Sequence, residues 1–186
     1  MKCLRLLVAL VLLPLVSFAA DRPLKIDKER SYIDVDVKVT AGSFTARLEN
    51  YDTSFSVDAA GKIKTAVLKF NFTDLKTGKP DRDASMIKWL GGGAPEGKFE
   101  VGILALAPDG QGQVTGKLTC HGQTARVEFP VNVTQADGTY TITGETTIDY
   151  RDWALKVIKM ALVLKVDPLV KIRFKFTGTL PAAPAE

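Results

Sequence analysis

Cys120 and His121 are adjacent in the sequence, and a thiol beside an imidazole is a combination that can form an activated nucleophile. His121 is the one histidine of the chain. Neighbouring residues of a strand point to opposite faces, so these two side chains would not converge on one substrate atom without a bulge. We therefore expect an inward, unreactive cysteine and a histidine in a solvent-facing turn.

Other catalytic signatures are absent from the sequence. Histidine and cysteine residues are not clustered at the spacing of a metal site. No G-x-S-x-G, Walker A or dinucleotide-binding glycine motif occurs. We expect no catalytic residues and no metal.

A series of basic residues lies near the C-terminus: Lys156, Lys159, Lys165, Lys171, Arg173 and Lys175. The simplest explanation is that they form the solvated outer face of strands. The alternative is that they bind the protein electrostatically to an anionic membrane surface.

Alternation of apolar and polar residues predicts the strands that must position these side chains. The clearest case is a hairpin over 114–133, with its bend at His121, Gly122 and Gln123. Segment 153–166 fits neither the strand period nor the helix period. The same alternation predicts further strands within 33–39, 44–48, 51–57, 66–72, 99–105, 140–148 and 170–176.

One segment interrupts the β pattern. Asp81 is placed to cap a helix, and the apolar residues within 82–90 predict a short helix that stops at the glycines 91–93. We expect this helix to cover one end of the sheet, as a plug or as a lid.

A sheet of about eight half-apolar antiparallel strands is best protected by closing on itself, and eight strands can enclose one small ligand. We therefore predict an all-β fold, an eight-stranded antiparallel barrel with one short helix near one end. A two-sheet sandwich is the competing closure. Asp83 and Asp152 could both approach the mouth of such a barrel, which leaves a carboxylate pair open as an alternative.

Residues 1–19 have the pattern of a secretory signal peptide. Lys2 and Arg5 precede an apolar run, and small residues follow it. The run is shorter than the roughly 20 residues of a membrane-spanning helix. We expect cleavage after Ala19 or Ala20 and a periplasmic or secreted protein.

The remaining chain has the composition of one soluble domain, with 46% apolar and 25% charged residues overall. We expect the domain to cover 20–180 and a flexible tail to cover 181–186. Without Lys2 and Arg5, 23 of the 25 basic residues face 21 acidic ones, a net charge of +2. This charge is too small to indicate a nucleic-acid partner.

The hairpin over 116–124, Gly-Lys-Leu-Thr-Cys-His-Gly-Gln-Thr, resembles the Gly-x-Leu-Thr-x-x-Gly-x-Thr hairpin of the YceI-like family. Arg82-Asp83 and the spacing from Pro95 to Phe99 resemble further family motifs, and the likeness covers 24–180. The chain departs from the family pattern at Lys79, Ser85 and Trp153, among other positions. The resemblance implies a lipocalin-like barrel and an exported protein that binds lipids or polyisoprenoids.

An apolar barrel interior can hold an apolar chain, because each CH₂ taken from water contributes roughly 0.8 kcal/mol. We expect the protein to sequester or carry an isoprenoid, quinone or fatty-acyl lipid, with no cofactor besides such a ligand. Arg82 is placed to pair with a phosphate or quinone oxygen at the mouth, and Met86 and Trp89 to act as movable apolar cover. The predicted ligand-binding residues are Phe44, Phe70, Arg82, Asp83, Met86, Trp89, Phe99, Val101, Phe129, Trp153 and Phe174.

Two alternative functions remain open. One is an interaction protein with a packed barrel that docks a membrane-bound partner through its basic face. The other is an enzyme that uses the barrel as a reaction cavity, since fold alone does not decide function. We favour a binding protein without enzymatic activity, as a monomer or homodimer that contacts an amphiphilic lipid and, transiently, an anionic membrane surface, but no nucleic acid.

Overall fold

The computed structural model describes residues 21–160 and 164–181 of the chain. The predicted signal peptide and the tail beyond Pro181 lie outside the described residues. The described elements are β1 (Arg22–Val39), β2 (Gly42–Leu48), β3 (Asp52–Val57), β4 (Ile63–Asn71), η1 (Phe72–Asp74), β5 (Leu75–Lys76), α1 (Pro80–Trp89), β6 (Glu96–Leu106), β7 (Gln111–Cys120), β8 (Gln123–Ala136), β9 (Thr139–Asp149), η2 (Tyr150–Trp153), β10 (Lys159–Met160) and β11 (Leu164–Thr179).

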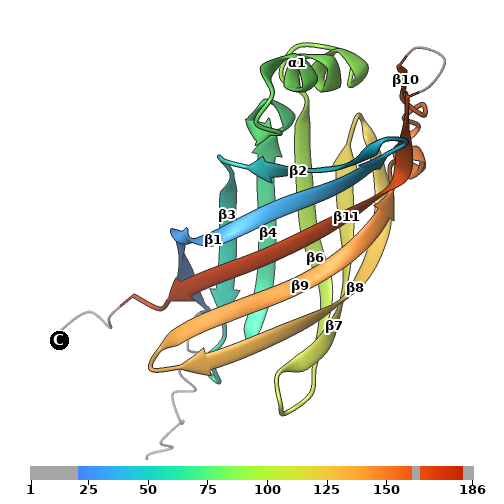
Figure 1. Ribbon diagram of the computed structural model, residues 1–186. Coiled ribbons are helices and arrows are strands. Elements are labelled where there is room, and N and C mark those ends of the chain that lie inside the picture. Colours follow the sequence, from blue (N-terminus) through green and yellow to red (C-terminus); the bar gives the residue numbers. More distant parts are fainter. Residues whose placement is uncertain (1–20, 161–163, 182–186) are drawn as a thin grey trace, which may run out of the picture.

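The sheet closes on itself because its last long strand pairs with its first. The order β11-β9-β8-β7-β6-β4-β3-β1 is antiparallel throughout, and β1 pairs again with β11, for example through Val35 and Ile172. Figure 1 shows the long strands wrapping around a common axis. The predicted eight-stranded barrel is confirmed, and the sandwich alternative is wrong.

Strands β2 and β3 share one position beside β1. Residues 34–39 of β1 pair with β2, and residues 22–24 of the same strand pair with β3. The two short strands then separate, since Arg47 of β2 pairs with Lys76 of β5 while Asp52 of β3 pairs with Lys69 of β4. The barrel wall therefore divides near Leu48, on the side that leads to α1 (Figure 1).

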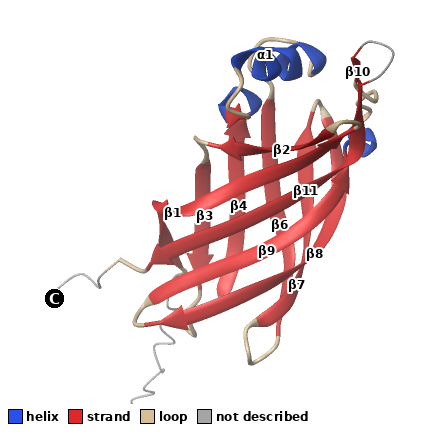
Figure 2. Ribbon diagram, viewed as in Figure 1, coloured by secondary structure: helices blue, strands red, loops and turns tan. Residues whose placement is uncertain are grey.

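The helical segments gather at one end of the barrel (Figure 2). Helix α1 begins with Pro80, whose fixed φ and missing N–H suit the first turn. Its N-cap is Lys79 and makes no side-chain capping bond, so the prediction that Asp81 caps the helix was wrong. Instead, Asp83 accepts hydrogen bonds from the backbone N–H and the hydroxyl of Thr77, at 3.0 and 2.6 Å. No described helix is long and apolar enough to cross a membrane.

The segment that periodicity left undecided consists of several short pieces. Helix η2 ends at Trp153 and is followed by Ala154, whose φ of 58° is left-handed, and β10 then pairs with the start of β11. Trp153 is only 1% exposed, and its indole N–H donates to Leu118 O at 2.8 Å. Burial of this indole fixes the segment against β7, a contact that no local sequence period encodes.

The hairpin bend is shorter than the sequence analysis proposed. His121 and Gly122 form it alone, with φ values of 49° and 68°, and Gln123 already belongs to β8. Two consecutive positive φ values match the twist of antiparallel strands joined by a two-residue turn.

Candidate functional site

An elongated cavity of about 1220 Å³ occupies the barrel interior. This volume exceeds the roughly 300–1,000 Å³ of pockets for drug-sized ligands. Each of the eight barrel strands contributes side chains to the lining, as the inward half of the apolar alternation. The interior is therefore not filled by the protein's own side chains, which the packed-barrel alternative requires.

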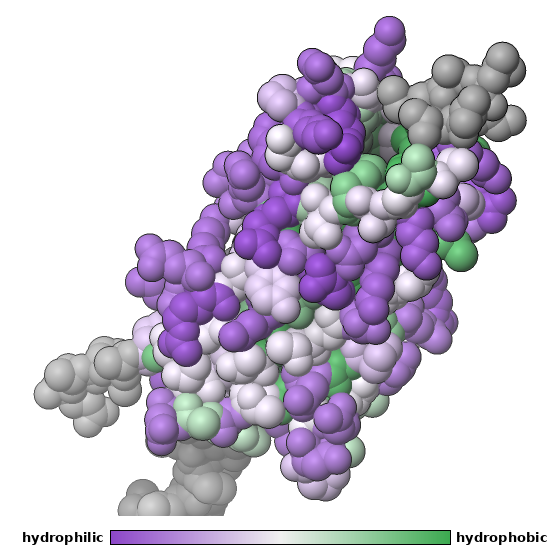
Figure 3. Space-filling view, viewed as in Figure 1, coloured by the Kyte–Doolittle hydropathy of each residue, from purple (hydrophilic) through white to green (hydrophobic). Residues whose placement is uncertain are grey.

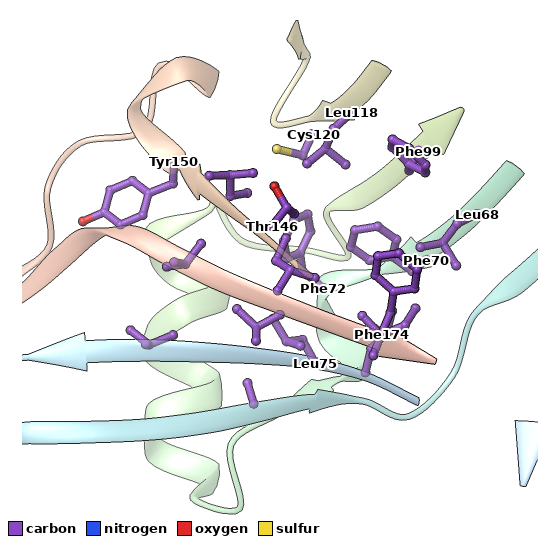
Figure 4. A pocket seen from close by; sticks show the side chains of 18 of the residues that line it. Leu68, Phe70, Phe72, Leu75, Phe99, Leu118, Cys120, Thr146, Tyr150 and Phe174 are labelled. Carbon is purple, nitrogen blue, oxygen red and sulfur yellow. The ribbon is translucent and has the colours of Figure 1, made fainter. Parts of the chain in front are cut away.

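Phenylalanine rings from several strands project into this cavity (Figure 4). The ring centroids of Phe99 and Phe129 lie 5.7 Å apart, as do those of Phe129 and Phe174. Phe70 and Phe72 meet edge to face at 5.1 Å. Such rings provide large apolar contact area with few rotatable bonds.

Glycines on neighbouring strands make room for these rings. A Cβ at Gly144 would lie 2.6 Å from Phe174 Cζ, and a Cβ at Gly116 would lie 2.5 Å from Phe99 Cε2. Gly144 pairs directly with Phe174 across β9 and β11. The glycines thus allow these two rings to approach the backbone of the neighbouring strand closely.

The C-terminal end of α1 contacts the η2 segment. Trp89 Nε1 donates to Lys156 O at 2.8 Å, and its ring meets Tyr150 edge to face with centroids 5.1 Å apart. Leu90, directly after the helix, is 4% exposed, whereas no residue within α1 is buried. Apolar side chains are visible in a hollow beside α1 in the space-filling view (Figure 3). Helix α1 thus covers the cavity end and is attached at both of its ends, through the bonds of Asp83 in its first turn with Thr77 and through Trp89 in its last turn.

Arg82 lies at the same end. Its guanidinium carbon is 3.9 Å from the centroid of the Phe44 ring, within the range of a cation–π interaction. Both side chains are partly buried and line the cavity. The predicted position of Arg82 at the mouth therefore agrees with the structure.

Ten of the eleven predicted ligand-binding residues line the cavity. They are Phe44, Phe70, Arg82, Met86, Trp89, Phe99, Val101, Phe129, Trp153 and Phe174. Asp83 is not part of the lining, because its carboxylate turns toward Thr77. Asp152 is exposed and does not line the cavity either, so the carboxylate pair left open above does not form there.

Cys120 faces the cavity and His121 does not. The cysteine is 6% exposed, and burial raises the pKa of its thiol to about 12, so it is protonated at neutral pH. His121 is exposed, and its Nδ1 lies 3.3 Å from Trp153 O. The expected inward cysteine and outward histidine are confirmed. Within the described residues, no group of three His, Cys, Asp or Glu side chains could hold a metal ion.

The C-terminal basic series is divided between two environments. Lys171 pairs with Glu145 at 2.8 Å, and Arg173 pairs with Asp36 at 2.7 Å, both across the outer wall. Lys165 instead lines the cavity. The prediction that these basic residues form a solvated outer strand face is therefore correct for Lys171 and Arg173 but not for Lys165.

Several lining residues were missed. Leu118 follows the alternation of the β7 hairpin and was open to prediction by parity. Thr146 shares the parity of Ile142 and Ile148 on β9 and was likewise open to prediction. Leu75 lies in a two-residue strand and Tyr150 lies in η2, where no pattern marked an inward role. Figure 4 shows these side chains around the same space.

A family model for the YceI-like domain matches residues 24–178. No curated protein matches the sequence significantly. The fold is similar to that of BcnA from Burkholderia cenocepacia, with 20% identity, a TM-score of 0.69, and coverage of 83% of this chain and all of the other. It is also similar to the Campylobacter jejuni YceI protein, with 12% identity, a TM-score of 0.60, and coverage of 74% of this chain and 85% of the other. On the extent of the family match, this chain belongs to the YceI-like domain family.

Proposed function

We propose that this protein binds an elongated apolar lipid, an isoprenoid, quinone or fatty-acyl compound, inside its barrel and sequesters or carries it. The observation that carries this proposal is the cavity of about 1220 Å³ with aliphatic or aromatic side chains at almost every strand position of its lining. An apolar space of this size favours an apolar occupant over water.

Tail length decides whether such burial is enough. Ten buried methylenes contribute about 8 kcal/mol, and association itself costs about 4 kcal/mol or more. Short amphiphiles therefore bind weakly, while long-chain lipids gain a net advantage. The length of the barrel suits the second group, since the lining follows β4 from Ile63 to Phe70, about 23 Å at roughly 3.3 Å per residue.

Export and a non-catalytic role belong to the same proposal. The signal-like residues 1–19 support a periplasmic or secreted location, where a lipid must cross water between membranes. The high pKa of the Cys120 thiol and the outward position of His121 support a binding role without a nucleophile. Loading would require transient contact with a membrane surface.

The test is mass spectrometry of organic extracts from protein purified without detergent, together with uptake of a fluorescent long-chain lipid. Val101→Trp places an indole in the lumen, whereas Glu100→Trp places the same side chain on the outer face of the same strand. We expect wild type and Glu100→Trp to take up the lipid, and Val101→Trp to lose at least tenfold in affinity. Absence of any amphiphile from the extracts together with no uptake by wild type would contradict the proposal.

A further inference from the structure

The charged residues of the cavity lining are concentrated at the α1 end. Lys79, Arg82 and Lys88 come from α1 or its N-cap, and Lys165 comes from the start of β11. Among the residues that the structure describes, Lys64, at the start of β4, is the one lining cation at the opposite end. Within the same residues, a single carboxylate, Asp81, belongs to the lining. The mouth beside α1 therefore carries an excess of positive charge.

These mouth cations differ from the arginines of the outer wall. Arg47, Arg126, Arg151 and Arg173 each form an ion pair with a carboxylate. Among the described residues, no ion pair includes Lys79, Arg82, Lys88 or Lys165. Asp83, the acidic neighbour of Arg82, accepts hydrogen bonds from Thr77 and forms no ion pair with Arg82.

Arg82 is held in a definite position without using its hydrogen-bond donors. Its contact with the Phe44 ring, at 3.9 Å, is made by the guanidinium carbon, and no hydrogen bond from its side chain to a described residue is present. A guanidinium stacked on a ring keeps its N–H groups in the plane, where they can grip two oxygens of a phosphate or carboxylate. An anion at this place would also relieve the repulsion among the mouth cations.

We propose that the ligand is an anionic amphiphile whose phosphate or carboxylate head binds the guanidinium of Arg82, beside the Phe44 ring. Its tail extends from the α1 end toward Ile63. This inference rests on the proposed function, since it assigns the head group and the direction of a lipid bound in the same cavity.

The experiment compares dodecyl phosphate, dodecanoate and dodecanol, which share a tail and differ in the head. Affinities are measured by displacement of a fluorescent lipid. Wild type is expected to bind both anions at least tenfold more tightly than the alcohol, and high salt should reduce this preference. Arg82→Gln should remove about tenfold of the affinity for dodecyl phosphate and leave that for dodecanol within twofold, whereas Arg82→Lys should retain most of the preference.

Lys69→Gln is the matched control, because Lys69 is exposed on β4 and does not line the cavity. Equal affinity of wild type for dodecyl phosphate and dodecanol would overturn the head-group inference alone. Loss of the anion preference in Lys64→Gln rather than in Arg82→Gln would overturn the assigned direction. Failure of wild type to bind the fluorescent long-chain lipid itself would overturn the proposed function and this inference with it.

Discussion

The ring of Phe70 lies directly over Gly97, its partner across the β4–β6 pair, so closely that a Cβ at position 97 would be 2.2 Å from Phe70 Cζ. The absence of a side chain on β6 thus sets the position of a ring that lines the cavity on β4. The pairing of Phe70 with Gly97 therefore contributes both to the packing of the barrel wall and to the space left open in the lumen.

Gly97→Ala is expected to push the Phe70 ring away from the wall. The strain should lower the free energy of unfolding by about 1–3 kcal/mol, as is typical of overpacking, and reduce lipid uptake because the ring enters the lumen. Urea denaturation and fluorescent-lipid titration measure the two effects. Gly102→Ala on the same strand is the control, since its Cβ would meet only Thr115 O, at 3.4 Å. Equal effects of the two substitutions would show that the ring contact is not the cause.

Trp89→Phe is expected to loosen α1. The substitution keeps an aromatic ring beside Tyr150 but removes the N–H that donates to Lys156 O. A hydrogen bond of about 0.5–1.5 kcal/mol corresponds to roughly two- to tenfold faster release of the lipid. Stopped-flow release kinetics give the rate, and hydrogen exchange should rise in α1 but not in β9. Unchanged release with faster exchange in α1 would show that the ligand does not leave past this helix.

The thiol of Cys120 is expected to be nearly unreactive in the folded protein. Burial raises its pKa to about 12, so little thiolate is present at pH 8, whereas an unfolded cysteine ionises near 8.5. In a Cys3→Ser chain, labelling by iodoacetamide should be at least about 100-fold slower in buffer than in urea. Saturation with a lipid should slow it further, because Cys120 lines the cavity. Equal rates in buffer and urea would contradict the buried position.

Asp36→Asn is expected to lower stability by about 1 kcal/mol at neutral pH. The carboxylate of Asp36 accepts hydrogen bonds from Arg173 Nε and Thr45 Oγ1, and these bonds hold its pKa below the ordinary 3.8. A group with a lowered folded pKa contributes stability that is fully present above the unfolded pKa and is lost as the pH falls through the folded pKa.

The difference between wild type and Asp36→Asn should therefore be constant above about pH 5 and fade below pH 3.8. Chemical denaturation at a series of pH values measures it. Asp52→Asn, which changes an exposed aspartate on β3, is the control and should leave the free energy of unfolding at neutral pH within about 0.5 kcal/mol of wild type. A difference that grew toward low pH would contradict the assigned pairing.

Local alternation was sufficient to predict the barrel wall. Each long strand is apolar on one face only, so the inward positions of Phe99, Phe129 and Phe174 follow from parity alone. A short helix was also predicted, over 82–90, because glycines follow it; the structure begins it two residues earlier, at Pro80, and ends it at Trp89.

Features that depend on residues far apart in the sequence could not be predicted from local alternation. Leu75 pairs with Leu48 in a strand of two residues, too short for any period to reveal. The carboxylate of Asp83 binds Thr77 rather than facing the cavity, because the loop before α1 brings the Thr77 hydroxyl within hydrogen-bond distance. The buried indole of Trp153 likewise depends on Leu118, 35 residues earlier in the chain.

The most direct test of a lipid-filled barrel is a crystal structure of protein purified from its native source without detergent. The account predicts continuous elongated density inside the barrel, bordered by Phe99, Phe129 and Phe174 and ending beside Arg82. A lumen that contains only water, or one that has collapsed so that these rings fill it, would contradict the account.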